Sequence, residues 1–342
     1  MNPLTTEKPF GNLDSLPVTE YSISNKNGMV VSVINYGAIL TKIITADKDG
    51  NFGNTLIGFD SVNDYIQNGP QYIGCIVGRY CNRIADAKFS VDGHEYPLAV
   101  NNMSNNLHGG IKGFDQALWN VAKKTGNSIT LTHFSKDGDE GFPGNLHVEV
   151  TYALTEDNEL VIDYTARTDK ATPVSLTSHC YFNLSAGREP TVLDHELKIF
   201  ADEYTVLNEV MIPTGEIASV KNRAIDFSTA KKVGRDIQHT ADADGYDLNF
   251  VLKSQNKAAE LYDPSTGRFM EMFTTEPGLQ FYSGNYLQAI KTSNNKTFLK
   301  HAGLCLEAQH YPNSPNEPSF PNTILRPGEI YRQKTSYKFS VK

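Results

Sequence analysis

The chain has 342 residues and a formal net charge of −8, and its 31 basic residues are scattered, which argues against a nucleic-acid partner. Its apolar runs are too short to span a membrane, and its length suffices to bury a large core without disulfides or metals. The four cysteines form no C-x-x-C pair, and no leader pattern opens the chain, so we expect reduced thiols and a cytoplasmic location.

Short stretches rich in Val, Ile, Tyr, Phe and Thr recur between clusters of Gly, Asn, Asp and Pro, a pattern typical of β-strands. The clearest stretches are 29–38, 128–134, 146–154, 160–168, 196–207, 268–275 and 331–341. Helical periodicity is weak, and only 61–68 and 227–238 have the pattern of a short helix. The composition stays level, without linker or repeat, so we expect one domain over residues 1–342 and an all-β fold, a sandwich rather than a barrel.

Two loop-like stretches in the first third of the chain carry polar side chains. GRYCNRI supplies Arg79, Asn82 and Arg83, and NNLHGGIKGFD supplies His108. The two glycines after this histidine allow a ligand or another part of the backbone to come close. Taken one at a time, these residues fit a structural role as well as a functional one. Arg79 and Arg83, for example, are equally typical of a charge-paired loop that closes one end of a core.

The stretch SLTSHCYFNL, residues 175–184, has two different faces if it is read as a strand. Alternation places His179 among hydroxyl and amide side chains, while leucine and phenylalanine side chains occupy the opposite face. A histidine held rigidly among such groups can have its tautomer and charge set by its neighbours. A lone histidine on a strand is more often structural than catalytic, but this context favours a proton donor or acceptor.

Three later strands repeat the pattern of a polar face on an otherwise apolar strand. Asp247 lies in GYDLNFVL, Gln280 in GLQFYSGN and Glu307 in GLCLEAQHY. Amide, carboxylate, guanidinium and imidazole groups together suit a ligand with many hydroxyl groups, such as a sugar. The aromatic residues nearby are candidates for stacking on a pyranose ring, namely Tyr181, Phe182, Phe281 and Tyr282.

Taken in order, these motifs and the closing FPNTILRPGEIY resemble the aldose 1-epimerases, also called galactose mutarotases. The resemblance runs from about Asn35 to Lys342. It implies an antiparallel β-supersandwich with an open sugar cleft, and an isomerase that interconverts the α and β anomers of free hexoses such as galactose and glucose. It also implies a reaction without metal or cofactor, which agrees with the lack of a phosphate loop or dinucleotide fingerprint in the sequence.

The resemblance assigns roles residue by residue. The catalytic carboxylate of the family falls on Glu307, its catalytic acid on His179 and its second active-site histidine on His108. Its sugar-contacting residues fall on Asn82, Arg83, Asp247 and Gln280. Arg79 belongs to the same motif but receives no sugar contact. The sequence departs from the family at Cys81, Leu248 and Asn313, where alanine, histidine and aspartate are common, and the last two leave the preferred sugar open.

Anomer exchange requires a proton to leave the C1 hydroxyl while another reaches the ring oxygen. We expect Glu307 to be the base, ionised in the resting enzyme, and His179 to be the acid, protonated in the resting enzyme. With ordinary pKa values of ~4.3 for a glutamate and ~6.5 for a histidine, the rate should fall on both sides of an optimum.

Four other interpretations remain open from the residues alone. His108, His179 and Glu307 are the residue types of a facial metal triad, although their spacing resembles no metal motif. Asp247 and Glu307 are the one evident carboxylate pair for glycoside hydrolysis. A non-catalytic sugar-binding module and an epimerase acting on phosphosugars are the remaining alternatives. The sequence sets neither the preferred aldose nor the choice between monomer and homodimer.

Overall fold

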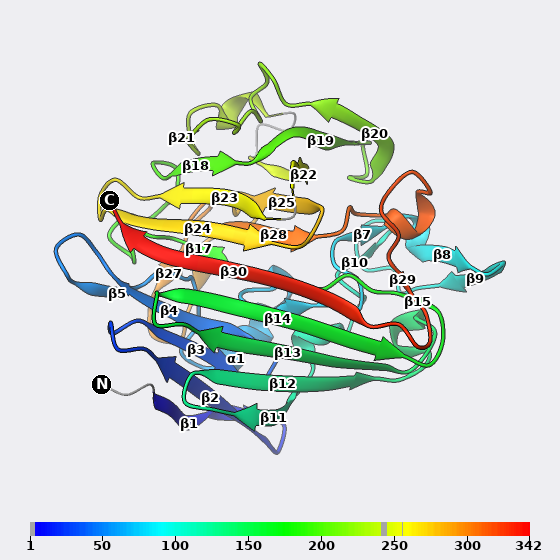
Figure 1. Ribbon diagram of the computed structural model, residues 1–342, viewed down its shortest axis with the longest axis horizontal. Helices are drawn as coiled ribbons and strands as arrows, with labels where there is room; N and C mark the ends of the chain where they lie inside the picture. Colours follow the sequence, from blue (N-terminus) through cyan, green and yellow to red (C-terminus); the bar gives the residue numbers. More distant parts are fainter. Residues whose placement is uncertain (1–3, 241–244, 255) are drawn as a thin grey trace.

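The computed structural model describes residues 4–240, 245–254 and 256–342. It confirms the all-β prediction, because the protein is built mainly of antiparallel sheets, the three largest with nine, six and five strands. Each of the seven stretches expected to be strands contains one. In Figure 1 the nine-stranded sheet runs across the front of the molecule, with the other two large sheets behind and below it.

The nine-stranded sheet has the spatial order β11 (Asn120–Lys124), β12 (Ser128–Ser135), β13 (Leu146–Leu154), β14 (Glu159–Thr168), β30 (Tyr331–Val341), β24 (Arg268–Thr274), β23 (Lys257–Tyr262), β18 (Glu196–Ile199) and β21 (Lys231–Lys232). The last strand of the chain, β30, therefore pairs with β14 on one side and β24 on the other. Figure 1 shows it in red between these two neighbours.

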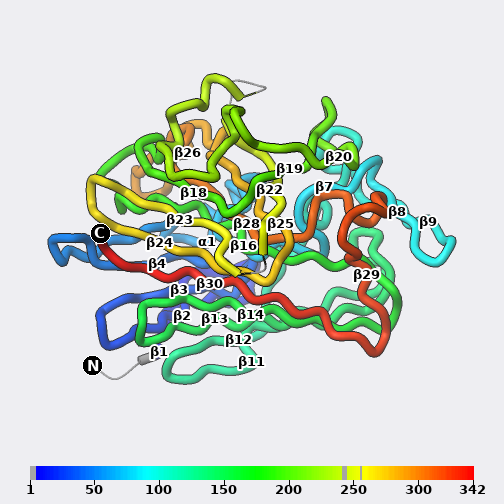
Figure 2. The backbone as a smooth tube through the Cα atoms, turned by 45° about the horizontal axis from the view of Figure 1, so that its top comes forward, coloured from blue at the N-terminus to red at the C-terminus, as the bar shows by residue number. Residues whose placement is uncertain are grey.

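The six-stranded sheet has the order β17 (Tyr181–Phe182), β28 (Leu304–Gln309), β25 (Gly278–Tyr282), β22 (Asp247–Leu252), β19 (Ala201–Leu207) and β20 (Pro213–Ser219). The five-stranded sheet takes its strands in chain order: β1 (Leu4–Leu13), β2 (Leu16–Ser24), β3 (Val30–Ile34), β4 (Leu40–Ala46) and β5 (Phe52–Asn54). Its edge strand β1 lies beside β11 in both views of the backbone, and an ion pair between Lys124 and Glu7 joins the two edges (Figure 2).

The remaining strands form pairs: β6 (Ile76–Val77) with β16 (Thr177–Ser178), β7 (Arg83–Ile84) with β10 (Asn106–Leu107), β8 (Lys88–Val91) with β9 (His94–Pro97), β15 (Thr172–Pro173) with β29 (Ile324–Leu325), and β26 (Ile290–Lys291) with β27 (Thr297–Phe298). Short 3₁₀ helices span Gly69–Gln71, Ala85–Ala87, Phe114–Gln116, Asp139–Gly141, Ile237–His239 and Ser314–Asn316. Within the described ranges, no helix is long and apolar enough to cross a membrane.

Of the two short helices expected from the sequence, the structure contains one. Helix α1 (Val62–Gln67) begins after Ser61, whose side chain accepts a hydrogen bond from the backbone N–H of Asp64. The stretch 227–238 is not an α-helix. Its middle forms β21, the edge of the nine-stranded sheet, where Lys231 pairs with Leu197 of β18. Tertiary pairing therefore overrides the weak local preference.

Side-chain alternation separates core from surface along the sheets. In β13 the odd positions of the strand are buried and the even ones are exposed or half-buried, so Leu146, Val148 and Val150 lie in the main core. The six-stranded sheet also contributes one face to this core, through Phe250, Leu279 and Leu306. Its other face is polar. The register places Asn249 opposite Gln280 and Gln280 opposite Glu307, so these three side chains form a row across three strands.

Candidate active site

A cavity of about 250 Å³ lies over the polar face of the six-stranded sheet. All seven residues that the sequence singled out line it: Asn82, Arg83, His108, His179, Asp247, Gln280 and Glu307. Their strands or loops come from six separate parts of the chain, and the fold brings these parts together around one cavity. The lining also includes residues that the sequence analysis did not assign to the site, namely Pro70, Gln71, Tyr72, Asn102, Leu107 and Tyr286.

Two of the four aromatic residues expected near a sugar line the cavity, and two do not. Tyr181 and Tyr282 contribute to its wall. Phe182 and Phe281 are fully buried in the main core, so their expected stacking role is wrong. Each of these phenylalanines follows or precedes a cavity tyrosine by one position, and adjacent side chains of a strand point to opposite faces.

The two polar loops meet through the pairing of β7 with β10, which sets Arg83 opposite Leu107. Just beyond that pair, the backbone N–H of His108 donates to the carbonyl of Asn82 (3.0 Å), and the backbone N–H of Asn82 donates to Nδ1 of His108 (3.2 Å). A ring nitrogen that accepts carries no proton, so the neutral ring holds its proton on Nε2. Burial, aided by His179 and Arg83, holds the pKa of His108 well below its usual range. His108 is therefore a neutral donor.

The glycine after His108 serves the backbone rather than a ligand. Gly109 has a φ of +89°, and a Cβ at this position would lie 2.1 Å from the carbonyl oxygen of Gly78. Arg79, next to Gly78, points away from the cavity. Its guanidinium is buried and donates to the carbonyl oxygens of Pro143 and Gly144 and to Ser135. Its guanidinium therefore closes one end of the core.

His179 occupies the gap between β16 and β17 rather than the interior of one continuous strand. Its backbone N–H donates to the carbonyl of Cys75 (2.9 Å), which fixes the position of the ring. The ring centroid lies 5.2 Å from that of Tyr181 and 5.4 Å from that of His108. Nδ1 lies 3.5 Å from Sγ of Cys305. The histidine is thus held on several sides by packing, with Nε2 directed at the strand that carries Glu307.

Glu307 lies in the middle of β28, and its Oε1 is 3.8 Å from Nε2 of His179. Its Oε2 is buried and has no hydrogen-bond partner among the described residues. Burial raises the pKa of Glu307 well above its usual range, Asp247 adds to the rise, and Arg83 opposes it. An orphaned carboxylate oxygen in an apolar setting is costly, which marks this residue as a candidate for chemistry.

The charges expected for the resting pair need correction. Burial lowers the pKa of His179 to about 4, although its own backbone carbonyl opposes the shift. Because burial raises the pKa of Glu307 as well, both groups favour their neutral forms in the ligand-free site. In a state with one shared proton, these shifts favour the proton on Glu307 over the proton on His179. The ion pair assumed from the sequence is the other tautomer of the same protonation state.

Asp247 is held on two sides at the rim of the cavity. Nε2 of Gln280 donates to its Oδ1 (2.6 Å), and Nη2 of Arg83 lies 3.9 Å from its Oδ2. Nε of Arg83 donates in turn to Oδ1 of Asn102 (3.0 Å). Because the side chain of Asp247 keeps 18% of its surface exposed, the carboxylate can still accept hydrogen bonds from a ligand.

The positions of three residues would allow a metal ion to bind, but the hydrogen bond that His108 accepts does not fit a metal ligand. One potential ligand atom from each of His108, His179 and Glu307 lies within 4.8 Å of the others. A histidine that binds a metal through one nitrogen donates from the other. In His108 that other nitrogen, Nδ1, faces the backbone N–H of Asn82, which is itself a donor. These residues suit hydroxyl groups better than a cation.

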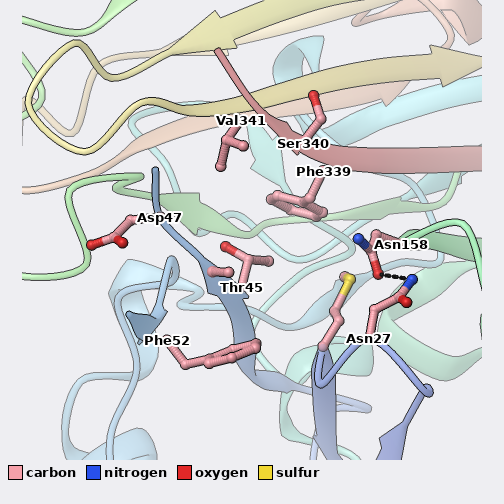
Figure 3. Close-up of a pocket in the computed structure, with 10 residues that line it drawn as sticks. Asn27, Thr45, Asp47, Phe52, Asn158, Phe339, Ser340 and Val341 are labelled. Atoms are coloured by element: carbon pink, nitrogen blue, oxygen red, sulfur yellow. Dashed lines mark hydrogen bonds between the residues drawn. The ribbon is translucent and has the colours of Figure 1, made fainter. Parts of the chain in front are cut away.

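A second cavity, of about 140 Å³, lies where the end of β30 meets β4 and β5 (Figure 3). Its wall includes Thr45, Asp47, Phe52 and Phe339, and it shares no described lining residue with the first cavity. The carboxylate of Asp47 accepts hydrogen bonds from the backbone N–H groups of Asp49 and Asn51 and pairs with Arg188. Among the residues described there, none is a histidine, whereas the first cavity has two histidines beside a carboxylate.

Comparisons with known proteins identify the family to which the chain is similar over almost its whole length. A sequence profile of the aldose 1-epimerase family matches residues 19–338. The galactose mutarotase of Pongo abelii is 41% identical, over 98% of this chain and 98% of its own length. The aldose 1-epimerase of Escherichia coli (strain K12) is 36% identical, over 98% and 99%. The crystal structure of galactose 1-epimerase from Lactobacillus acidophilus NCFM superposes with a TM-score of 0.87 at 28% identity and covers 99% of both chains.

Proposed function

The chain belongs to the aldose 1-epimerase family, whose members are isomerases, and we propose that it interconverts the α and β anomers of free hexoses such as galactose and glucose by acid and base catalysis. The single observation that carries this proposal is the pair at the floor of the cavity. A buried carboxylate, one oxygen of which has no hydrogen-bond partner among the residues that the structure describes, lies 3.8 Å from an imidazole nitrogen, and both groups have shifted pKa values. The two groups can exchange a proton across a bound ring.

In the proposed reaction, the sugar first changes the charge state of the pair. Hydroxyl groups of the sugar donate to Oε2 of Glu307, which favours the carboxylate and moves the shared proton to His179. Glu307 then takes the proton of the C1 hydroxyl while His179 gives its proton to the ring oxygen. The C1–O5 bond breaks and an open-chain aldehyde forms. Each such proton transfer typically contributes ~10² to 10⁴ in rate.

Ring closure reverses these transfers after rotation about the C1–C2 bond. The aldehyde presents its other face to the O5 hydroxyl, His179 takes the proton of that hydroxyl, and Glu307 returns a proton to the C1 oxygen. The anomer is exchanged, and the enzyme recovers its original protonation state. All protons balance within the pair, so the chain's own residues account for the whole reaction.

We assign the remaining polar residues to holding the ring in place. His108 donates from Nε2, and Asn82 and Arg83 offer further donors at the same wall. Asp247 accepts from sugar hydroxyls while Gln280 holds its other oxygen. Tyrosine rings complete the wall, which suits the apolar face of a pyranose.

A neutral aldose fits this cavity better than the substrates of the alternative enzymes. Among the described residues that line it, Arg83 is the sole Lys or Arg side chain, and it already faces Asp247, so a phosphate group would meet two carboxylates and little positive charge. Glycoside hydrolysis requires a second carboxyl group free to act on the bond. Asp247 is instead held by Gln280 and Arg83.

We also propose that the enzyme works in the cytoplasm, as a monomer or a homodimer. All four cysteines are buried and free, which suits a reducing compartment. The proposed reaction needs no binding partner other than the sugar.

The test is the mutarotation of pure α-D-galactose, followed by optical rotation at neutral pH with and without the protein. We expect a faster approach to the same final rotation, and repeats with glucose and xylose rank the substrates. An unchanged rate with every aldose would overturn the proposal. Cleavage of an aryl galactoside in a parallel assay would instead identify a hydrolase.

A further inference from the structure

Gln309 lies two residues after Glu307 on β28 and is fully buried behind the sugar-facing residues. Its amide nitrogen Nε2 donates to Oε1 of Gln280 (3.3 Å) and to Oδ1 of Asn249 (3.1 Å). It is not among the residues that line the cavity. It therefore reaches the substrate site only through other side chains.

The carboxylate of Asp247 sets the direction of this chain of hydrogen bonds. A carboxylate accepts and does not donate, so Gln280 must present its N–H group to it, and the Gln280 carbonyl oxygen must then point back toward Gln309. Gln309 must in turn present its own N–H group. Each amide has one orientation that satisfies both of its neighbours, and the opposite orientation would place two acceptors against each other.

A thiol completes the chain behind Gln309. With both N–H bonds of its amide in use, Gln309 needs a donor at Oε1, and Sγ of Cys81 lies 3.6 Å from it. Burial raises the pKa of the Cys81 thiol, so this group keeps its proton. Sγ of Cys81 is also 3.1 Å from Oγ of Ser175, which accepts from the backbone N–H of His310 (3.4 Å). Donors therefore follow one another in a single direction from this backbone N–H to Asp247.

We propose that Gln309 is a positioning residue for sugar recognition, because it turns the amide of Gln280 so that its N–H group holds Asp247 in place as an acceptor of sugar hydroxyls, and that the Cys81 thiol maintains the orientation of Gln309. The inference rests on the proposed function of the cavity as an aldose site. In the proposed reaction Asp247 binds sugar hydroxyls and transfers no proton, so it should stabilise the bound sugar and the transition state to a similar degree. Loss of the chain should then raise KM with little change in kcat.

The first experiment compares Gln309→Met with Gln280→Met and the double variant, using galactose mutarotation for KM and kcat and calorimetric titration with galactose for Kd. Methionine keeps the length of the side chain but removes the hydrogen bonds. We expect each single variant to raise KM and Kd about tenfold, with kcat within about threefold of wild type. The double variant should show no further increase, because both changes break the same chain.

The matched control is Gln333→Met. Gln333 of β30 is also a buried glutamine, and its side chain donates to the backbone carbonyl of Ala308, the neighbour of Gln309 on β28. In the described part of the chain it has no hydrogen bond to Asp247 or Gln280. We expect this variant to lose thermal stability and to keep its KM. Equal KM values for Gln309→Met and wild type, or a KM that rises as much in Gln333→Met, would overturn the inference.

The thiol provides a second test that does not depend on folding of Gln309→Met. Cys81→Ser keeps a donor at this position and should retain the wild-type KM, whereas Cys81→Ala removes the donor and should raise KM by about two- to threefold. Identical KM values for the two variants would contradict the role of the thiol. If the wild-type protein accelerates no aldose, the proposed function fails; if the wild type is active but Gln309→Met binds galactose normally, only the positioning role fails.

Discussion

Asp47 and Glu307 are both buried carboxylates in the walls of cavities, yet the protein treats them in opposite ways. Asp47 accepts hydrogen bonds from two backbone N–H groups and pairs with Arg188. Burial alone would raise its pKa, but these hydrogen bonds and the nearby guanidinium lower it. Glu307 has one oxygen without a hydrogen-bond partner in the described part of the chain, and burial raises its pKa.

The difference teaches how to separate a structural carboxylate from a reactive one in a fold that buries both. A carboxylate whose hydrogen bonds are complete stabilises the loop that surrounds it. A carboxylate left incomplete destabilises the folded protein and keeps an acceptor available for substrate. Substitutions, a pH profile and removal of metal ions test this difference between Asp47 and Glu307.

The largest expected effect comes from Glu307→Gln, which keeps the shape of the side chain but cannot take a proton. We expect kcat to fall by about 10³-fold or more, with galactose binding retained in a calorimetric titration. Because the pKa of Glu307 is raised in the folded state, ionisation lowers stability as the pH rises above the value of an unfolded glutamate. The variant should therefore melt no lower than wild type at pH 7. A rate above a tenth of wild type would exclude the base role.

Replacement of His179 tests the other half of the pair. His179→Gln should lower kcat by about 10²- to 10³-fold, because the amide can donate a hydrogen bond to the ring oxygen but cannot release a proton to it. Initial rates of optical rotation measure the effect. A loss confined to KM would show that the histidine only binds the sugar.

The pH dependence reports the proton that the pair shares. In the proposed mechanism the active state has one proton on Glu307 and His179 together, so activity should fall when a second proton binds, near pH 4, to which burial lowers the pKa of His179. Below that value kcat/KM should drop about tenfold per pH unit. On the alkaline side, activity falls with loss of the shared proton, at a pH well above the usual range of a glutamate. An acid limb near pH 6.5 would indicate a histidine with an ordinary pKa.

Asp47→Asn is the counterpart of the first variant and should have the opposite phenotype. The amide nitrogen would face the guanidinium of Arg188, so we expect the thermal midpoint at pH 7 to fall by roughly 2–4 °C while kcat and KM stay within twofold of wild type. Since the pKa of Asp47 is lowered in the folded state, its contribution is lost as the pH falls. The difference in midpoint between the two proteins should thus shrink at acid pH.

The smallest expected effect is that of a chelator. Overnight dialysis against EDTA should leave the mutarotation rate unchanged, because Nδ1 of His108 accepts a backbone N–H and the ring is polarised for hydroxyl groups rather than for a metal. If EDTA removed the activity and added zinc restored it, Glu307 would be a metal ligand rather than a base.

Strand alternation allowed the polar face of the six-stranded sheet to be predicted from the sequence. Gln280 and Glu307 each interrupt an apolar strand, and alternation alone places such side chains opposite the core. Asn82 and His108 needed the family resemblance as well, because their contact depends on the pairing of two short strands far apart in the chain. No local pattern reveals that pairing.

Other parts of the site depend on burial and on unusual backbone, which the sequence does not express. Tyr72 enters the cavity wall from a left-handed conformation (φ +52°) at the end of a 3₁₀ helix. Burial lowers the pKa of His179 and raises that of Glu307, so both groups favour their neutral forms where ordinary pKa values predict an ion pair. The residue types alone suggest an acid and a base, but the burial of His179 and Glu307 sets which of their protonation states is favoured.

The place of β30 in the middle of the nine-stranded sheet also constrains how the protein is made. β14 and β24 stand on either side of it, so neither can complete its hydrogen bonds until residues 331–341 have left the ribosome. The edge of β14 therefore stays unpaired from its own synthesis until β30 emerges. Unpaired strand edges, and strand pairs that join distant parts of the chain, slow folding and promote aggregation. The nascent chain should therefore depend on chaperones more than its native stability would suggest.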